Sequence, residues 1–60
     1  MKTIIIKNIN EVNFHKGVIS LKNNLPKDPS EYYLYIKDEF KKPKYYIWNG
    51  EWIKIKLKEN

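Results

Sequence analysis

The stretch that decides the fold is Tyr45-Tyr46-Ile47-Trp48-Asn49-Gly50-Glu51-Trp52-Ile53-Lys54-Ile55-Lys56-Leu57. Two runs of aromatic and β-branched residues, which favour strands, flank Asn49-Gly50. This arrangement predicts a β-hairpin, because a type I′ turn needs positive φ at both central residues. A two-residue turn places Trp48 opposite Glu51. The predicted core face is then Tyr46, Trp48, Ile53, Ile55 and Leu57, and the predicted outer face is Tyr45, Ile47, Trp52, Lys54, Lys56 and Lys58.

Other segments with strand-forming residues lie N-terminal to the hairpin. Residues 32–37 alternate between two apolar faces, and residues 18–22 and 3–9 also predict strands, with 11–14 as a further short extended piece. Apolar residues on both faces of several strands indicate that each face is covered. The sequence therefore predicts an all-β fold, a small antiparallel sheet or meander of about five short strands ending in the Asn-Gly hairpin.

The connections are marked by turn-forming residues. Residues 15–17 predict a turn, with Gly17 able to adopt positive φ. Residues 23–30 contain two prolines, two asparagines and an aspartate, which predict a loop. Residues 38–43 form a polar connection in which Phe40 is the candidate for burial, and Pro43 would end any short helix over 37–42.

Length and composition limit the domain organisation. The chain has 60 residues, twelve lysines, no arginine, no cysteine and a net charge of +5. A chain of this length buries only roughly 60% of its unfolded surface, and without disulfides it depends on an aromatic core or on a partner. We therefore expect residues 1–60 to form one small β domain that assembles. Residues 4–6 form an apolar run too short for a signal segment or a membrane span, so synthesis in a cytoplasm is expected.

The sequence offers few combinations of residues that could form a catalytic or metal-binding site. His15 is the only histidine, and no second histidine, cysteine or acid stands near it at ligand or dyad spacing. The two glycines, Gly17 and Gly50, do not form a phosphate-binding loop. The sequence predicts no enzyme activity, no metal and no cofactor.

Lysines near aromatic rings suggest a nucleic-acid alternative. On the predicted outer face, a basic row of Lys54, Lys56 and Lys58 lies beside Trp52 and Tyr45, and charge with aromatic faces is typical of single-strand binders. Arginine, the usual reader of phosphates and bases, is absent, and lysines also protect exposed strands from aggregation. Protection of the strand is therefore the favoured interpretation.

The exposed aromatics also allow two interpretations. Trp48 and Trp52 near the hairpin tip could stack on sugar rings, but a chain this small needs its large side chains for burial. We favour a core role for one tryptophan and packing against a neighbouring chain for the other. The candidate interface with a partner consists of Tyr33, Tyr35, Tyr45, Ile47 and Trp52.

Two further segments of the chain carry extended sequence motifs. Val12-Asn13-Phe14-His15-Lys16-Gly17-Val18-Ile19-Ser20-Leu21 is similar to Val-Asn-Gly-Lys-Thr-Gly-x-Val-Thr-Leu, with Phe14 in place of the first glycine, and thereby resembles a motif of tailed-phage fibre proteins. The second segment runs from Leu25-Pro26 to Tyr46-Ile47-Trp48-Asn49-Gly50-Glu51-Trp52-Ile53. It resembles Leu-Pro, a spacer, Gly-Asp-x-Tyr-x-Val and Tyr-x-Trp-Asp-Gly-x-x-Trp, with Glu31-Tyr32 at the Gly-Asp position and a tip one residue shorter.

The resemblance implies a virion structural protein: a fibre-associated, decoration or minor capsid component that acts in assembly or adhesion. It implies a homo-oligomer, a trimer by preference, that contacts other virion proteins. The alternative is a small phage-encoded protein that binds a host protein or single-stranded nucleic acid. Affinity for nucleic acid falls steeply with salt, whereas an apolar oligomer interface does not depend on it in that way.

Overall fold

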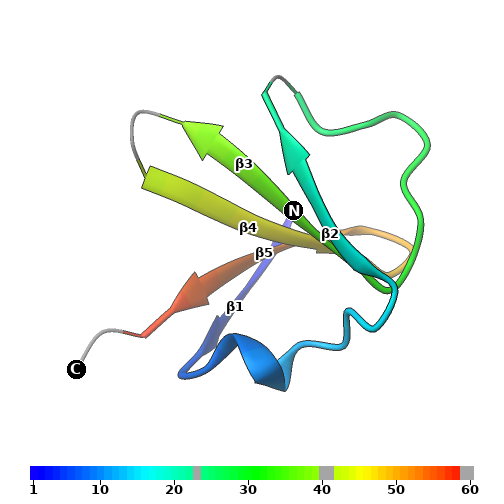
Figure 1. Ribbon diagram of the computed structural model, residues 1–60. Coiled ribbons are helices and arrows are strands. Elements are labelled where there is room, and N and C mark those ends of the chain that lie inside the picture. The colour runs from blue at the N-terminus through cyan, green and yellow to red at the C-terminus, as the bar shows by residue number, and fades with distance from the viewer. Residues whose placement is uncertain (23, 40–41, 59–60) are drawn as a thin grey trace.

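The computed structural model describes residues 1–22, 24–39 and 42–58, and it forms one five-stranded sheet with a single 3₁₀ turn in that part of the chain (Figure 1). The all-β prediction is therefore confirmed. The elements are β1 (Lys2–Ile6), η1 (Ile9–Glu11), β2 (Gly17–Leu21), β3 (Tyr33–Glu39), β4 (Lys42–Trp48) and β5 (Trp52–Leu57).

The sheet is mixed, with the strand order β1-β5-β4-β3-β2. The three central strands form two antiparallel hairpins, whereas β1 pairs parallel with β5 and β2 pairs parallel with β3. The predicted antiparallel meander thus holds only for the centre of the sheet. Parallel neighbours need a crossover, and the long connection between β2 and β3 serves this purpose for that pair. The segment around η1 carries the chain from the edge strand β1 to the other edge strand, β2 (Figure 1).

A capping box from Asn8 to Glu11 forms a 3₁₀ turn where the sequence predicted extended structure over 3–9 and 11–14. The side chain of Asn8 accepts a hydrogen bond from the backbone N of Asn10 at 3.0 Å. The Glu11 carboxylate accepts from the backbone N of Asn8 at 2.9 Å and of Lys7 at 3.0 Å. These bonds favour a helical turn, so β1 ends at Ile6 and residues 11–14 form no strand. The pattern Asn-x-x-Glu in the sequence is the signal for this turn.

The β3–β4 hairpin is longer than the sequence predicts. Strand β3 continues through Asp38, which pairs with Pro43 of β4. No helix therefore begins at Lys37, which lies in β3 opposite Lys44. Pro43 is tolerated because it lies near the start of β4, before the residues that pair with β5. Phe40, which was predicted to be buried, lies outside the described residues.

The β4–β5 hairpin has a different register from the predicted one. Trp48 pairs with Trp52 and Ile47 pairs with Ile53, so three residues connect the strands. Only Gly50 of the connection has positive φ, at 75°, so a type I′ turn is not formed. A shift of one residue moves each side chain of a strand to the other face. The observed register pairs Ile47 with Ile53 and Trp48 with Trp52 next to the turn, and it leaves Glu51 in the turn.

The register divides the strand residues between two faces. The first, called the apolar face below, carries Ile4, Ile6, Val18, Leu34, Ile36, Tyr45, Ile47, Ile53, Ile55 and Leu57. The second, called the aromatic–lysine face, carries Ile5, Ile19, Leu21, Tyr33, Tyr35, Lys37, Lys44, Tyr46, Trp48, Trp52, Lys54 and Lys56. The main hydrophobic cluster lies on the apolar face, where Leu34 and Ile55 cluster with Val12, and Ile9 and Phe14 pack against them. Tyr35 and Tyr46 are buried on the aromatic–lysine face.

We expect Gly50→Val to lower the free energy of unfolding by about 1–2 kcal/mol, because a side chain with a branched β-carbon resists the left-handed conformation. A β-carbon at this position would meet no atom within 4 Å, so the cost comes from the backbone alone. Gly50→Asn is the matched control, since asparagine tolerates positive φ. Urea unfolding followed by tryptophan fluorescence measures both. Equal stability of the valine, asparagine and native proteins would contradict this account of the turn.

Candidate functional site

The residues of the candidate interface do not share one surface. Tyr33, Tyr35 and Trp52 lie on the aromatic–lysine face, whereas Tyr45 and Ile47 lie on the apolar face. Tyr35 is also buried, with 3% of its surface exposed. The grouping predicted from a two-residue turn is therefore wrong, because the longer connection places Tyr45 and Ile47 beside the core isoleucines.

The rings on the aromatic–lysine face pack mainly edge to face. The ring of Trp52 lies 5.2 Å from that of Tyr35, 6.4 Å from that of Tyr46 and 5.3 Å from that of Trp48, at interplanar angles of 67–84°. The Tyr35 hydroxyl accepts a hydrogen bond from the backbone N of Ser30 at 2.9 Å, which ties the loop before β3 to this cluster. Edge-to-face packing stabilises the cluster. The ring surfaces buried in these contacts are not available to stack on a nucleic-acid base or a sugar ring.

The predicted lysine row is partly assembled. Lys54 and Lys56 lie on the aromatic–lysine face, where Lys54 is half-buried opposite Tyr46. Lys58 follows β5, and its backbone N donates to the carbonyl of Ile6 at 2.7 Å, which extends the β1–β5 pairing. Lys37 and Lys44, which the prediction did not include, join this face from the β3–β4 hairpin.

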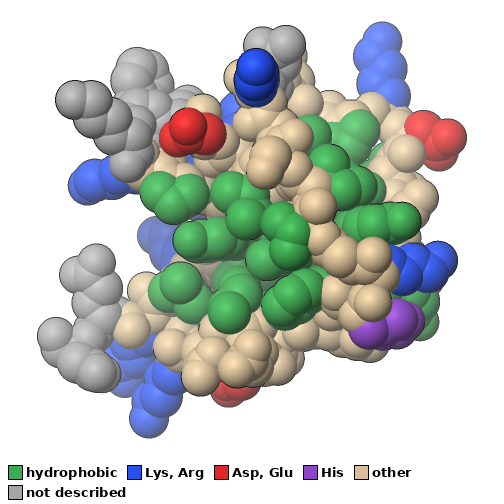
Figure 2. All heavy atoms as spheres, viewed as in Figure 1, with side chains coloured by type: hydrophobic (Ala, Val, Ile, Leu, Met, Phe, Trp, Pro, Cys, Tyr) green, Lys and Arg blue, Asp and Glu red, His purple; other side chains and the backbone are tan. Residues whose placement is uncertain are grey.

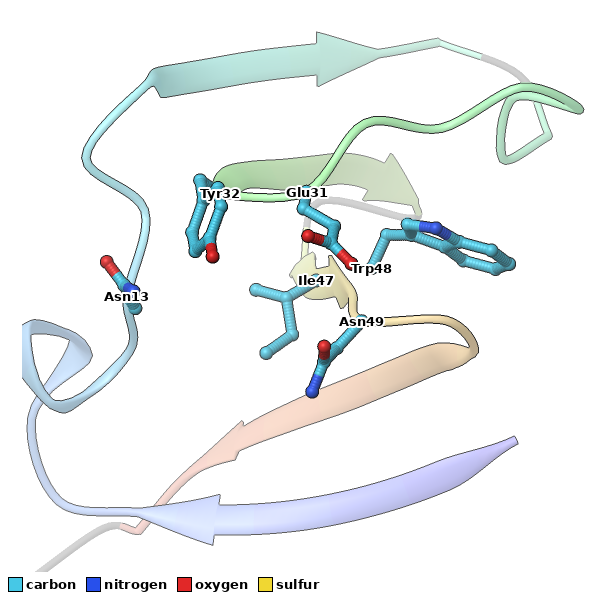
Figure 3. A pocket seen from close by; sticks show the side chains of 6 residues that line it. All are labelled: Asn13, Glu31, Tyr32, Ile47, Trp48 and Asn49. Atoms are coloured by element: carbon cyan, nitrogen blue, oxygen red, sulfur yellow. The ribbon is translucent and has the colours of Figure 1, made fainter.

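A hollow of about 280 Å³ lies where three loops meet at one end of the sheet. Figure 3 shows Tyr32 and Glu31 entering from the segment before β3, with Ile47 at the end of β4 turned toward the same space. Asn13 lies on the facing loop. The six lining residues are Asn13, Glu31, Tyr32, Ile47, Trp48 and Asn49.

Tyr32, which lines this hollow, has an unusual backbone conformation. Its φ is 68°, and it is the one residue other than glycine with positive φ in the described segments. The His15 ring stacks on it at 4.6 Å and 30°, and the backbone N of Lys16 donates to its carbonyl at 3.0 Å. The Lys16 ammonium lies 5.9 Å from the ring centroid. Positive φ in a bulky residue is costly, so these contacts hold Tyr32 where the free backbone would not place it.

Sequence reasoning missed this hollow. Its lining comes from three segments that are far apart in the chain, and the conformation of Tyr32 has no counterpart in composition or spacing. His15, which the sequence places in a predicted turn, stacks on Tyr32, and its Nδ1 lies 2.9 Å from Oδ1 of Asn13. The turn-forming asparagines were the only available signal.

No protein-family model, curated protein or solved structure matches this chain. Within residues 1–22, 24–39 and 42–58, no three histidine or acidic side chains lie close enough to hold a metal ion. The described residues also form no helix long and apolar enough to cross a membrane.

Proposed function

We propose that this chain is a virion structural protein that assembles with copies of itself and acts in particle assembly or adhesion. The observation that carries the proposal is the incompletely covered apolar face. Val18 is 53% exposed and Leu57 41% exposed, and Ile36 and Tyr45 are only half-buried. Figure 2, viewed from this side, shows the apolar side chains gathered over the middle of the molecule, with lysines around them.

The total surface supports assembly. The chain exposes 4897 Å², whereas a folded monomer of 7.3 kDa is expected to expose about 4,200 Å². The excess is roughly 700 Å².

The distribution of charge permits copies of a basic chain to approach. Most lysines of the described strands lie on the aromatic–lysine face. The charged strand residues on the apolar face are Lys2 and Asp38. Association through the apolar face therefore keeps the lysine rows of different copies apart, and their repulsion is reduced by distance and salt.

The resemblance to phage fibre modules supports the virion assignment. The first similar segment spans the turn after η1 and strand β2, and the second ends in the β4–β5 hairpin. Small β modules that share a core across chains gain stability from assembly. We therefore propose a trimer in which the apolar faces meet.

Sedimentation equilibrium at micromolar concentration tests the proposal. We expect the native chain to sediment at about three times 7.3 kDa, and the double variant Val18→Lys/Leu57→Lys to sediment as a monomer. Ile5→Lys is the matched control, because Ile5 is 68% exposed but lies on the aromatic–lysine face. A native monomer with a cooperative melt, or a loss of mass in the Ile5 variant alone, would overturn assembly through this face.

The same experiment separates the nucleic-acid alternative. A variant with Lys54, Lys56 and Lys58 replaced by glutamine should keep the native mass, because Lys54 and Lys56 lie on the aromatic–lysine face and Lys58 is exposed after β5, so none of them belongs to the apolar surface that associates. A complex with single-stranded DNA that the native chain forms only at low salt, and that this variant loses, would favour the alternative.

A further inference from the structure

We propose that the hollow beside Tyr32 binds a single ring of a neutral carbohydrate. The proposal deepens the adhesive part of the proposed function, but it is argued from the geometry of the hollow and tested separately from assembly. Three side chains from different segments define the polar part of the wall, Asn13, Glu31 and Asn49, while Ile47 and two aromatic residues supply the apolar part.

The lining has the chemistry that a polyol needs. A sugar ring carries several hydroxyl groups that both donate and accept hydrogen bonds, together with apolar C–H surfaces. The Glu31 carboxylate is an acceptor, and the Asn49 amide offers donors and an acceptor. Oδ1 of Asn13 lies 2.9 Å from Nδ1 of His15, so Asn13 contributes its amide N–H donors. Ile47 and the Tyr32 ring border the same space (Figure 3) and can pack against C–H groups.

The rigid placement of Tyr32 favours a binding role. Backbone strain of this kind persists only where surrounding contacts hold it, and it is concentrated at functional sites. Here the stack with His15 and the hydrogen bond from Lys16 hold Tyr32, although 40% of its surface remains exposed. A residue held in position while open to solvent presents a pre-organised surface, which lowers the entropic cost of binding.

The charges argue against ionic ligands. An anion would meet the Glu31 carboxylate in a hollow that no lysine lines. A cation would be opposed by the net charge of +5, and Glu31 is the one charged side chain in the lining. The volume, about 280 Å³, lies just below the range of about 300–1,000 Å³ for drug-sized ligands, which suits a smaller ligand such as one sugar ring.

A titration followed by ¹H–¹⁵N NMR tests the site. The probes are methyl α-D-glucopyranoside, methyl α-D-galactopyranoside and methyl N-acetyl-β-D-glucosaminide, with choline chloride and inorganic phosphate as ionic comparisons. We expect at least one glycoside to bind saturably in the millimolar range, as is reasonable for a single ring in a half-open site. The shifts should be centred on residues 13, 31–32 and 47–49.

A pair of glutamate variants makes the result specific. Glu31→Gln should weaken glycoside binding by about tenfold, because it removes a charged acceptor. Glu51→Gln is the matched control: Glu51 is also exposed and lies two positions after Asn49, but it does not line the hollow. Binding unaffected by Glu31→Gln, shifts centred elsewhere, preferential binding of choline or phosphate, or no binding of any glycoside would each overturn the proposal. None of these outcomes changes the sedimentation result, so failure of the sugar site is distinguishable from failure of assembly.

Discussion

Replacement of Ile55 by alanine is expected to leave much of the protein unfolded. Ile55 is 3% exposed, lies between Ile4 of β1 and Tyr45 of β4, and belongs to the buried cluster with Val12 and Leu34. Deletion of a buried isoleucine side chain beyond its β-carbon costs about 2–5 kcal/mol. A single core in a chain of this size rarely supplies more than about 3–5 kcal/mol, so the substitution removes most of the stability.

Ile5→Ala is the matched control for Ile55→Ala. Ile5 is the same residue type in the edge strand β1, but its side chain is 68% exposed on the aromatic–lysine face. We expect its replacement to change the free energy of unfolding by no more than about 0.5 kcal/mol. Urea titration with circular dichroism compares the two variants, and similar losses for both would contradict the location of the core.

Replacement of Trp52 by alanine is the second change with a large expected effect. Trp52 contacts the rings of Tyr35, Tyr46 and Trp48, and it is the centre of the aromatic cluster. Each such ring pair contributes about 0.5–1.5 kcal/mol beyond the burial of area. Because Trp52 is only half-buried, we expect a loss of about 3 kcal/mol, toward the lower end of the range for Trp→Ala substitutions.

Trp48→Ala provides the comparison within the same strand pair. In the described part of the chain, Trp48 makes one ring contact, with Trp52 itself. We expect its replacement to cost about 1–2 kcal/mol, from one ring pair and part of the buried area. Unfolding in urea, followed by near-ultraviolet circular dichroism, measures both variants. Equal costs, or a greater cost for Trp48, would show that Trp52 is not the centre of the cluster.

The fold class and the local turns could be read from the sequence, because they depend on neighbouring residues. β-branched and aromatic runs predicted the strands, and Gly17 and Gly50, with φ of 130° and 75°, lie at the predicted turns. The capping pattern from Asn8 to Glu11 was also present, but was read as part of two extended pieces. Composition likewise indicated a chain with apolar residues on both faces of its strands.

The register and the topology were decided only by the tertiary structure. The connection around Gly50 is one residue longer than predicted, and this difference exchanges the faces of Tyr45 and Tyr46. Both the predicted and the observed register pair two largely apolar strands, so the hydrophobic pattern alone does not distinguish them. The choice rests on packing against β1 and β3, which are distant in sequence. For the same reason, the parallel pairing of the edge strands could not be predicted from alternation alone.

The candidate site depended on the tertiary structure even more strongly. Asn13, Tyr32 and Asn49 are ordinary loop residues in the sequence, and they line one hollow only because the sheet brings three connections to the same end. The positive φ of Tyr32 is held by His15 and Lys16 across the chain. Local preference alone opposes that conformation. Short-range preferences thus determined which segments are strands and turns, while long-range packing determined which side chains meet, because packing energy exceeds local preference wherever the two conflict.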